Sequence, residues 1–507
     1  MQYRNPVIRG FNPDPSICRV GEDYYLVTSS FEYFPGIPIY HSRDLVNWKQ
    51  IGNCVQRAEE FPLTHVKDSG GIWAPSIRFH EGKFYVTATL EQYGNFIVSA
   101  EDPSGEWSGP VWVDVGGIDP SVLFDGEKVY YCTNQSEHPG REEITLEEID
   151  IETGRLLTPP KAVWSGIGGG FLEAPHIYHI GEWYYILTAE GGTNFNHMIT
   201  AGRSRSVWGP YEECPWNPVL TNVHDTSKEV QCSGHGDLVQ DHRGGWWMVH
   251  LGIRLCRRTM SNLGRETFLT PVEWEDGWFF AGENKKAKLV CEGPLWKEQE
   301  ESPEWRADLT SEKWDPEILF LRSPLKEHYR KMDRGLTIKP SAVSLSDGAS
   351  PSLVVRRPFD FDCEMETEFL FEPRENGDEA GVVVMLSAEF HVELCIRRDE
   401  DGTFLVLRKR AEDMIQEAFR EKAEDLIGKK LRMRIRADRE KYSFYFGLSG
   451  AELQMAGTAS TRFLCCELAG KCFTGTVWGL YAAGQRETAA ELSVDSWSMK
   501  GIRPQEN

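Results

Sequence analysis

One short motif recurs five times in the first half of the chain and constrains the fold more than any other feature. The copies start about 45 to 60 residues apart, at Pro15, Pro75, Pro120, Pro175 and Gly236. Each copy continues as a β-branched strand, a polar turn with glycine and a second, aromatic strand; the first reads Gly21-Glu22-Asp23-Tyr24-Tyr25-Leu26-Val27. This order is typical of a β-hairpin.

A repeat of this length, with several strands in each unit, predicts the blades of a β-propeller. One unit alone cannot bury both faces of its sheet, whereas units stacked around a common axis can. Five copies therefore predict a five-bladed propeller over residues 1–290. The alternative, five unrelated hairpins in a sandwich, does not explain why the copies share their opening residues.

The second half of the chain has a different pattern. A chain of 507 residues is too long for one hydrophobic core. A polar stretch over residues 291–306 predicts a linker. Residues 307–507 then hold many short strands, clearest in the strict alternation of residues 430–436, which together predict a β-sandwich. Within this all-β chain, only residues 412–422 suggest a short helix.

Charge and composition exclude several classes of partner. The net charge of −23 disfavours nucleic acid and anionic membranes. No stretch is long and apolar enough to span a membrane, and residues 1–6 carry no signal-peptide pattern. The 12 cysteines lack metal-site spacing and are expected to be buried, reduced thiols. We therefore expect a cytoplasmic protein. Assembly into a homo-oligomer through the sandwich is an open alternative.

Acidic residues open three of the five repeats. The first strand of each propeller blade lines the central channel, so Asp14, Asp119 and Glu173 are predicted to converge there. Trp73 and His235 open the other two repeats. A single Asp-Pro pair is most simply a turn. Three acids at equivalent positions need another explanation, because buried carboxylates are costly unless they are paired or used.

Converging carboxylates suit the hydrolysis of a glycosidic bond. One acid must stay protonated to donate to the leaving oxygen, and another must be ionised. A third nearby charge would keep the pKa of the first acid high by repulsion. Glu173 follows an apolar, glycine-rich approach, Gly168-Gly169-Gly170-Phe171-Leu172, and is the candidate acid.

Several segments that span all five repeats carry a family resemblance; they are residues 10–17, 31–45, 69–75, 118–121, 173–176, 189–193, 234–235 and 263–267. In these segments the chain resembles glycoside hydrolase family 43, in its β-xylosidase and α-L-arabinofuranosidase branch. The resemblance implies an inverting mechanism with Asp14 as general base, Glu173 as general acid and Asp119 tuning and orienting that acid. The base and acid should then lie roughly 6.5–9.5 Å apart.

The same resemblance implies further residues of the pocket. Phe31 and Trp73 match aromatic walls around the terminal sugar. Arg265 matches an arginine whose fork binds sugar hydroxyls or holds a carboxylate ionised. His235 matches a histidine at the channel centre, beside which some relatives hold calcium. Because a lone histidine is more often a hydrogen-bonding group, we expect no required cofactor, and calcium near His235 stays an alternative.

The second half is similar to the concanavalin-like sandwich of xylosidases in this family. Residues 470–479 resemble a loop that closes the pocket, which would place Phe473 beside the substrate and favour attack on chain ends. The same residues could equally form a strand of the sandwich core. Residues 251–264 are shorter than a Pro-rich segment of some relatives, which leaves the choice between xylose and arabinose open.

These features predict an inverting exo-glycosidase that removes β-1,4-linked xylose from the non-reducing ends of small xylo-oligosaccharides. An α-L-arabinofuranosidase, or an enzyme with both activities, is the near alternative. A non-catalytic, sugar-binding propeller is the alternative of another class, and it would not need converging acids. The sequence does not indicate linkage and chain-length preference, oligomeric state, metal dependence or pH optimum.

Overall fold

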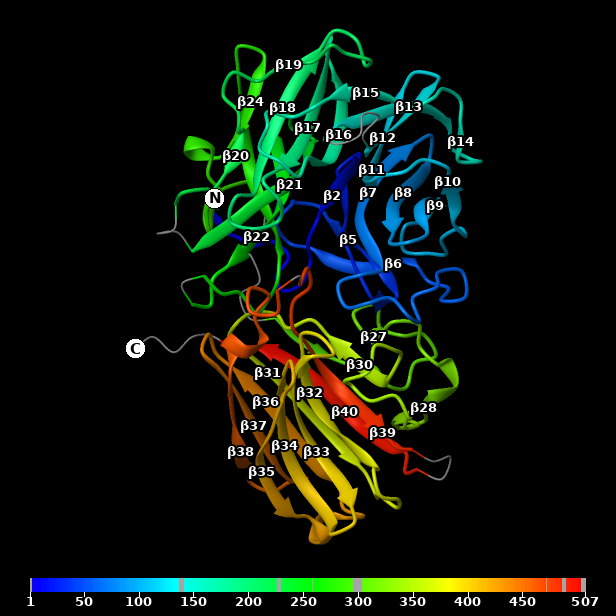
Figure 1. Cartoon of the computed structure of the whole chain (residues 1–507), viewed down its shortest axis with the longest axis vertical. Helices are drawn as coiled ribbons and strands as arrows, with labels where there is room; N and C mark the ends of the chain where they lie inside the picture. The colour runs from blue at the N-terminus through cyan, green and yellow to red at the C-terminus, as the bar shows by residue number, and fades with distance from the viewer. Residues whose placement is uncertain are drawn as a thin grey trace.

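The computed structural model describes residues 2–135, 141–225, 229–257, 259–294, 303–470, 472–485 and 489–502. A five-bladed propeller and a β-sandwich lie one above the other along the long axis of the molecule (Figure 1). The only helices among the described residues are four short 3-10 turns: η1 (Glu283–Lys285), η2 (Lys326–His328), η3 (Glu424–Leu426) and η4 (Thr461–Leu464). The predicted all-β fold is therefore confirmed. No helix in the described ranges has the length and apolarity to cross a membrane.

Each blade is an antiparallel sheet whose innermost strand carries the start of one repeat. Blade one contains β2 (Ser16–Val20), β3 (Asp23–Val27), β5 (Gly36–Ser42) and β6 (Lys49–Val55). Blade two contains β7 (Ile72–His80), β8 (Lys83–Leu90), β9 (Gly94–Ala100) and β10 (Val111–Val113). Blade three contains β11 (Ile118–Asp125), β12 (Lys128–Asn134), β13 (Ile144–Asp150), β14 (Arg155–Leu156) and β15 (Lys161–Trp164).

The last two blades complete the ring. Blade four contains β16 (Glu173–Ile180), β17 (Trp183–Glu190), β18 (Met198–Ser204), β19 (Glu212–Glu213) and β20 (Leu220–Thr221). Blade five contains β21 (Val230–Gln240), β22 (Trp246–Arg254), β23 (Glu266–Glu275) and β24 (Trp278–Ala281). The terminal strand β1 (Gln2–Arg4) pairs with β25 (Val290–Glu292). Apolar clusters between neighbouring blades form most of the propeller core, as expected when single sheets cannot bury both faces.

The opening of every repeat, within the inner strand or just before it, holds a non-glycine residue with positive φ. The angle is 55° at Asp14, 31° at Ala74, 54° at Asp119, 52° at Ala174 and 50° at His235. The last four lie within a shift of register between the inner strand and its neighbour. Such backbone costs about 1–3 kcal/mol per non-glycine residue and persists only where the surrounding structure imposes it. Positive φ therefore recurs at the opening residues of all five repeats, and in blades two to five it falls at a break in strand register.

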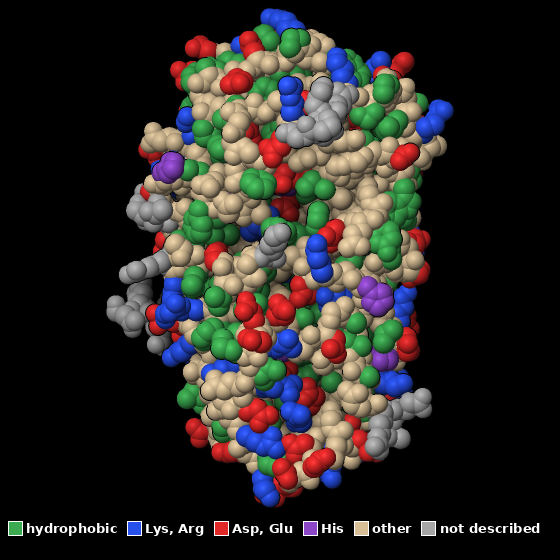
Figure 2. All heavy atoms as spheres, in the orientation of Figure 1, with side chains coloured by type: hydrophobic (Ala, Val, Ile, Leu, Met, Phe, Trp, Pro, Cys, Tyr) green, Lys and Arg blue, Asp and Glu red, His purple; other side chains and the backbone are tan. Residues whose placement is uncertain are grey.

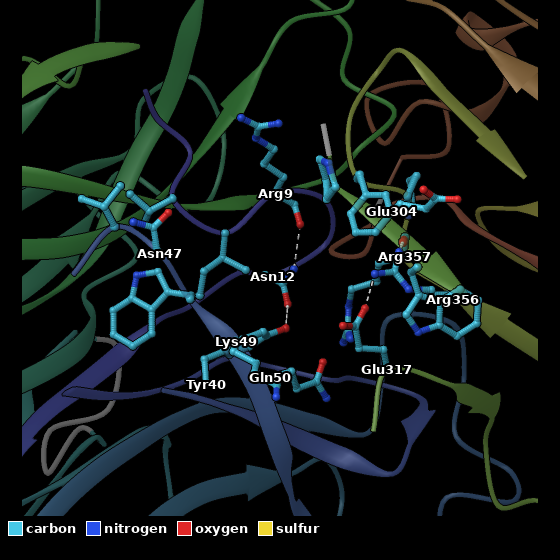
Figure 3. A pocket seen from close by; sticks show the side chains of 18 residues that line it. Arg9, Asn12, Tyr40, Asn47, Lys49, Gln50, Glu304, Glu317, Arg356 and Arg357 are labelled. Atoms are coloured by element: carbon cyan, nitrogen blue, oxygen red, sulfur yellow. Dashed lines mark hydrogen bonds and ion pairs between the residues drawn. The ribbon is translucent and has the colours of Figure 1, made fainter. Parts of the chain in front are cut away.

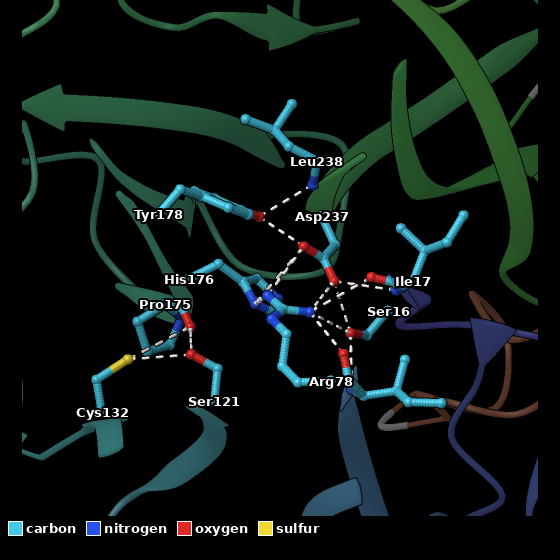
Figure 4. A network of polar contacts seen from close by, with 11 residues as sticks. Ser16, Ile17, Arg78, Ser121, Cys132, Pro175, His176, Tyr178, Asp237 and Leu238 are labelled. Carbon is cyan, nitrogen blue, oxygen red and sulfur yellow. Dashed lines mark hydrogen bonds and ion pairs between the residues drawn. The ribbon is translucent and has the colours of Figure 1, made fainter. Parts of the chain in front are cut away.

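One buried carboxylate ties the inner strands together (Figure 4). Asp237 on β21 accepts hydrogen bonds from Ser16 on β2 (2.6 Å), from Tyr178 on β16 (2.6 Å) and from Arg78 on β7 (2.8 and 3.2 Å). Burial alone raises the pKa of Asp237, but Arg78 and the hydrogen bonds outweigh burial and hold this pKa well below its usual range. Blades one, two, four and five are thereby linked at the axis.

The sandwich consists of two packed antiparallel sheets. The first holds β35 (Met414–Lys422), β34 (Gly402–Ala411), β33 (Phe390–Asp399), β32 (Glu379–Met385), β39 (Val477–Ala483), β30 (Ser352–Arg356), β27 (Leu319–Leu321) and β4 (Tyr33–Phe34). The second holds β28 (Tyr329–Met332), β29 (Gly335–Ile338), β40 (Leu492–Gly501), β31 (Cys363–Leu370), β36 (Leu431–Ala437), β37 (Lys441–Leu448), β38 (Gln454–Ser460) and β26 (Glu304–Arg306). Leu431, Met433 and Ile435 of β36 are buried, as the alternating pattern indicates.

The two parts share a sheet. The short strand β4 belongs to the propeller sequence but pairs with β27 of the sandwich, with Phe34 opposite Phe320 and Tyr33 opposite Leu321. Residues 295–302 of the predicted linker lie outside the described residues. The predicted domain limits stay a prediction.

The helix predicted over residues 412–422 is wrong. Met414–Lys422 forms the edge strand β35, which pairs antiparallel with β34. Its side chains are almost all exposed, so a helix here would have had no apolar face to bury. The open edge of β34 instead supplies backbone hydrogen-bond partners, which local helix propensity cannot anticipate.

Candidate active site

Asp14 is a buried carboxylate held by three elements. Its Oδ2 accepts a hydrogen bond of 2.6 Å from Ser29, and its Oδ1 accepts one of 2.7 Å from Nη1 of Arg265. His235 Nδ1 lies 3.8 Å from Oδ1. Burial favours the neutral form, but the charge of Arg265 and the hydrogen bond from Ser29 lower the pKa of Asp14 below its usual value. Asp14 is therefore ionised at neutral pH, as a base must be.

Asp119 and Glu173 form a second, coupled pair. Asp119 is the second residue of β11 and accepts a 3.1 Å hydrogen bond from the backbone N–H of Ala174, next to Glu173. Burial, and then the charges of Glu173 and Asp14, raise the pKa of Asp119 well above its usual value. Burial and the charge of Asp14 likewise raise the pKa of Glu173 to about 7. At neutral pH this pair therefore retains a proton, close to an ionised Asp14.

A glutamate outside the predicted set fixes the approach to Glu173. Glu190, at the end of β17, accepts hydrogen bonds from the backbone N–H groups of Ile167 (2.9 Å) and Gly169 (2.7 Å) and from the hydroxyl of Thr200 (2.7 Å). The glycine-rich loop before Glu173 is therefore anchored at Ile167 and Gly169. Glu190 acts on Glu173 only through this loop, so it is a positioning residue.

Arg265 connects the propeller to the sandwich at the site. Besides Asp14, its fork donates to the hydroxyl of Thr193 (3.1 Å) and to the carbonyl of Phe473 (3.1 and 3.3 Å). The backbone N–H of Phe473 donates in turn to Ser69 of the propeller over 2.9 Å. Phe473 lies before β39, outside the strand. Of the two alternatives, a pocket loop or a core strand, its segment is therefore the loop. Lys471 of this segment lies outside the described residues.

Aromatic rings cover one side of Arg265. The guanidinium carbon lies 5.6 Å from the ring centre of Phe31 and 5.7 Å from that of Phe473. The two rings are 6.2 Å apart, and Trp73 packs on the same cluster. Such apolar walls remove water from the neighbouring charges and can enclose a sugar ring. Near the middle of the propeller half, Figure 2 shows acidic side chains recessed between hydrophobic ones.

His235 is buried, and burial together with Arg265 lowers its pKa, so it is neutral. Among the described residues there is no group of three or more His, Cys, Asp or Glu that could hold a metal ion. Calcium prefers six to eight oxygen ligands. Asp14, whose Oδ1 lies 3.8 Å from His235 Nδ1, already binds Arg265. These residues do not fit a calcium site.

All eight predicted site residues thus lie around Asp14 and Glu173 or on the adjoining aromatic cluster. Their roles stay predictions. The sequence did not single out Ser29, Ser69, Glu142, Thr193, Glu190 or His197. His197 is buried, and its Nδ1 lies 3.1 Å from the carbonyl oxygen of Cys232. The available signal was that Ser69, Glu190 and Thr193 fall in segments shared with the family.

The five-bladed propeller, with an ionised carboxylate facing a protonated pair in an aromatic pocket, defines a glycoside hydrolase. The family model described as glycosyl hydrolases family 43 matches residues 3–279, and the one described as beta xylosidase C-terminal concanavalin A-like domain matches residues 306–500. The chain belongs to glycosyl hydrolase family 43.

The similar proteins include enzymes of both predicted activities. A non-reducing end alpha-L-arabinofuranosidase of Bacteroides ovatus is 38% identical over 98% of this chain and 94% of its own. A xylosidase/arabinosidase of Humicola insolens is 31% identical over 99% of this chain and 98% of its own. The crystal structure of a xylan beta-1,4-xylosidase from Bacillus halodurans matches with a TM-score of 0.89 and 31% identity, over 98% of this chain and 99% of that one.

Proposed function

We propose that this protein is an inverting exo-glycosidase that removes a terminal β-linked xylose from the non-reducing end of small oligosaccharides. The observation that carries this proposal is the opposite shift of two pKa values in one pocket. The pKa of Asp14 is lowered and that of Glu173 is raised to about 7. Pairs of carboxyl groups that are driven apart in this way serve as base and acid in glycoside hydrolysis.

In the proposed reaction, Glu173 donates its proton to the glycosidic oxygen as the bond to the anomeric carbon breaks. Ionised Asp14 takes a proton from the water that attacks the opposite face of that carbon. Asp119, which accepts a hydrogen bond from the backbone N–H of Ala174, orients the acid. Burial and the charge of Asp14 raise the pKa of Glu173. The leaving sugar departs as the alcohol, and the released pentose has the inverted anomeric configuration.

Attack on chain ends is supported by the closed side of the pocket. Phe473 and Phe31 cover Arg265, and the sandwich loop is bonded to the propeller through Ser69. A pocket closed in this way receives one terminal sugar and excludes the middle of a chain.

The second candidate is an α-L-arabinofuranosidase, because the relative of 38% identity is named for that activity. The Humicola insolens relative is named for both activities, which supports a pocket that accepts either pentose. We name β-xylose first because the Bacillus halodurans and Humicola insolens relatives are both named for xylosidase activity.

The test compares kcat/KM for nitrophenyl β-D-xyloside and nitrophenyl α-L-arabinofuranoside, and then follows xylotriose hydrolysis by NMR. The proposal expects a preference for the xyloside and release of α-xylose from the non-reducing end. A preference for the arabinofuranoside would establish the second candidate. Retention of the β-configuration would overturn the inverting mechanism.

We also propose a cytoplasmic location. Its support is that all twelve cysteines are free thiols. Even Cys256 and Cys465, whose sulfur atoms lie 3.8 Å apart, do not form a disulfide. Fractionation of the native host, followed by immunoblotting, tests it. Recovery of the protein with the secreted or membrane fraction would contradict it.

A further inference from the structure

A separate cavity lies between the propeller and the sandwich (Figure 3). Its volume is about 420 Å³, within the range of small-molecule sites. The propeller contributes residues from 7–12 and 46–50, and the sandwich side contributes residues from 303–305 and 356–359. None of the eight predicted active-site residues lines it.

The most informative side chain in this cavity is Arg357. It is only 7% exposed, and its Nε and Nη2 are buried without a hydrogen-bond acceptor among the described residues. The guanidinium carbon lies 5.1 Å from the ring centre of Phe11, which covers it but accepts no strong hydrogen bond. A buried guanidinium without an acceptor is costly, because it has lost water and gained nothing equivalent. The geometry therefore calls for a ligand with oxygen acceptors.

The charges around the cavity favour an anion. Four cationic side chains line it, Arg9, Lys49, Arg356 and Arg357, against the two acids Glu304 and Glu317. Arg9 is paired with Asp360 at 3.4 Å, and Arg356 is paired with Glu317. Within the described ranges, Lys49 and Arg357 have no ion-pair partner. A pocket with surplus positive charge is unusual in a chain whose net charge is −23.

The rest of the lining suits a small polar molecule with a flat face. Trp48 and Tyr40 contribute rings, and Asn47 contributes an amide. The side chain of Asn12 accepts from Tyr40 over 2.6 Å, so part of this wall is already ordered. Rings beside hydrogen-bonding groups are the usual surroundings of a bound sugar.

We propose that this cavity, hereafter the interdomain site, binds a small ligand with an oxyanion, either the carboxylate of a sugar acid or a phosphate. Arg357 supplies the buried donors, and Lys49 supplies a second positive charge at the exposed side. Guanidinium groups bind both oxyanions through paired N–H donors. The site does not depend on the proposed hydrolysis, and its occupancy can be measured without substrate.

The experiment is calorimetric titration of the full-length protein at constant ionic strength, with inorganic phosphate, D-glucuronate and neutral D-xylose as separate probes. Arg357→Met removes the donors but keeps the apolar stem, and Lys49→Gln removes the exposed charge. Lys429→Gln, an exposed lysine on the sandwich, is the matched control. We expect an oxyanion to bind the wild type, and about 10- to 100-fold weaker binding after Arg357→Met, the loss typical of a charge-assisted hydrogen bond.

Preference for glucuronate over phosphate would assign a sugar acid, and the reverse would assign a phosphate. Absence of binding by both anions would overturn the proposal. Equal binding by wild type, Arg357→Met and Lys49→Gln would also overturn it, because the anion would then sit elsewhere. If Arg357→Met does not fold, Lys49→Gln decides alone, with about tenfold weaker binding expected and Lys429→Gln unchanged.

Discussion

Arg265 donates to both carboxylate oxygens of Asp14, over 2.7 and 3.3 Å, and its Nη2 and Nε also bind the carbonyl of Phe473. One guanidinium therefore sets the charge of the candidate base and fixes the sandwich loop against the propeller. Removal of this group should affect both the ionisation of Asp14 and the closure of the pocket.

We expect Arg265→Met to lower kcat/KM by about 10- to 100-fold or more, since a charged hydrogen bond to the base is lost. The base must be ionised, and Arg265 lowers the pKa of Asp14. Without Arg265 that pKa rises, so activity on the acid side should be lost at a higher pH than in the wild type. The pH profile of kcat/KM measures this shift. Arg205→Met, at an exposed pair with Glu182, is the control, and an unmoved acid limb would contradict the assignment.

Glu173→Gln tests the acid. It should lower kcat/KM for xylobiose by roughly 10²- to 10⁴-fold, and far less for a nitrophenyl xyloside, whose leaving group needs no proton. The wild type should lose activity as pH rises through about 7, where Glu173 gives up its proton, and the variant should lack this limb. Equal losses on both substrates would argue against a general acid.

A second variant near Glu173 is Glu142→Gln, whose carboxylate accepts a 3.3 Å hydrogen bond from the backbone N–H of Leu172. The charge of Glu142 contributes to the raised pKa of Glu173. Its removal should lower that pKa, so the alkaline limb should move to lower pH with only a small loss of kcat. An unchanged limb would mean that burial and Asp14 alone set the pKa of Glu173.

The axial network predicts a stability effect. Asp237→Asn leaves Arg78 buried without its charge partner, a change that costs about 3–5 kcal/mol. The melting temperature should therefore fall on the order of 10 °C. Because folding lowers the pKa of Asp237, its contribution is present above the unfolded pKa of about 3.9 and is lost as pH falls below it. Calorimetry at pH 7 and at low pH measures both effects.

The control for this network is Glu152→Gln, which breaks the exposed pair with Lys83 on the surface of the same propeller. Exposed pairs contribute about 0–1 kcal/mol, so its melting temperature should hardly change. A similar, small change for both variants would show that the axial carboxylate does not stabilise the blades.

The repeat made the channel acids predictable, because equivalent positions in a propeller face the same axis. The repeat pattern alone was enough to predict that Asp14, Asp119 and Glu173 lie at the channel. Ser29 and Thr193 were not predictable in this way, because neither lies at the opening of a repeat. The contact of Thr193 with Arg265 also joins positions 72 residues apart. The bulges at the start of the inner strands also leave no residue signature, since Ala74 and Ala174 adopt positive φ as readily as the acids.

Long-range pairing explains the remaining differences. The strand β4 completes a sheet of the other domain, and β35 pairs at an open edge although its residues favour a helix. Both outcomes depend on backbone partners that the local sequence does not contain. Phe473 illustrates the same limit, because its hydrogen bonds with Ser69 and Arg265, far away in the sequence, identify its segment as a pocket loop.

The last prediction concerns Phe171, two residues before Glu173. Its side chain is 61% exposed and its φ is 52°, so an apolar ring is held in solvent on strained backbone. The ring lies against Gly192, where an added Cβ would come within 3.3 Å of it. Because Glu173 protonates the leaving oxygen in the proposed reaction, a ring at this position should stack on the leaving sugar.

We therefore expect Phe171→Ala to raise KM for xylobiose by about 3- to 10-fold, the effect of one aromatic contact, with kcat nearly unchanged. Phe171→Trp should preserve KM, because the larger ring keeps the stacking face. Met455→Ala, at an exposed apolar side chain on the edge strand β38, is the control and should leave both constants unchanged. A fall in kcat at constant KM would instead mean that Phe171 positions Glu173, and a role in binding the leaving sugar would be excluded.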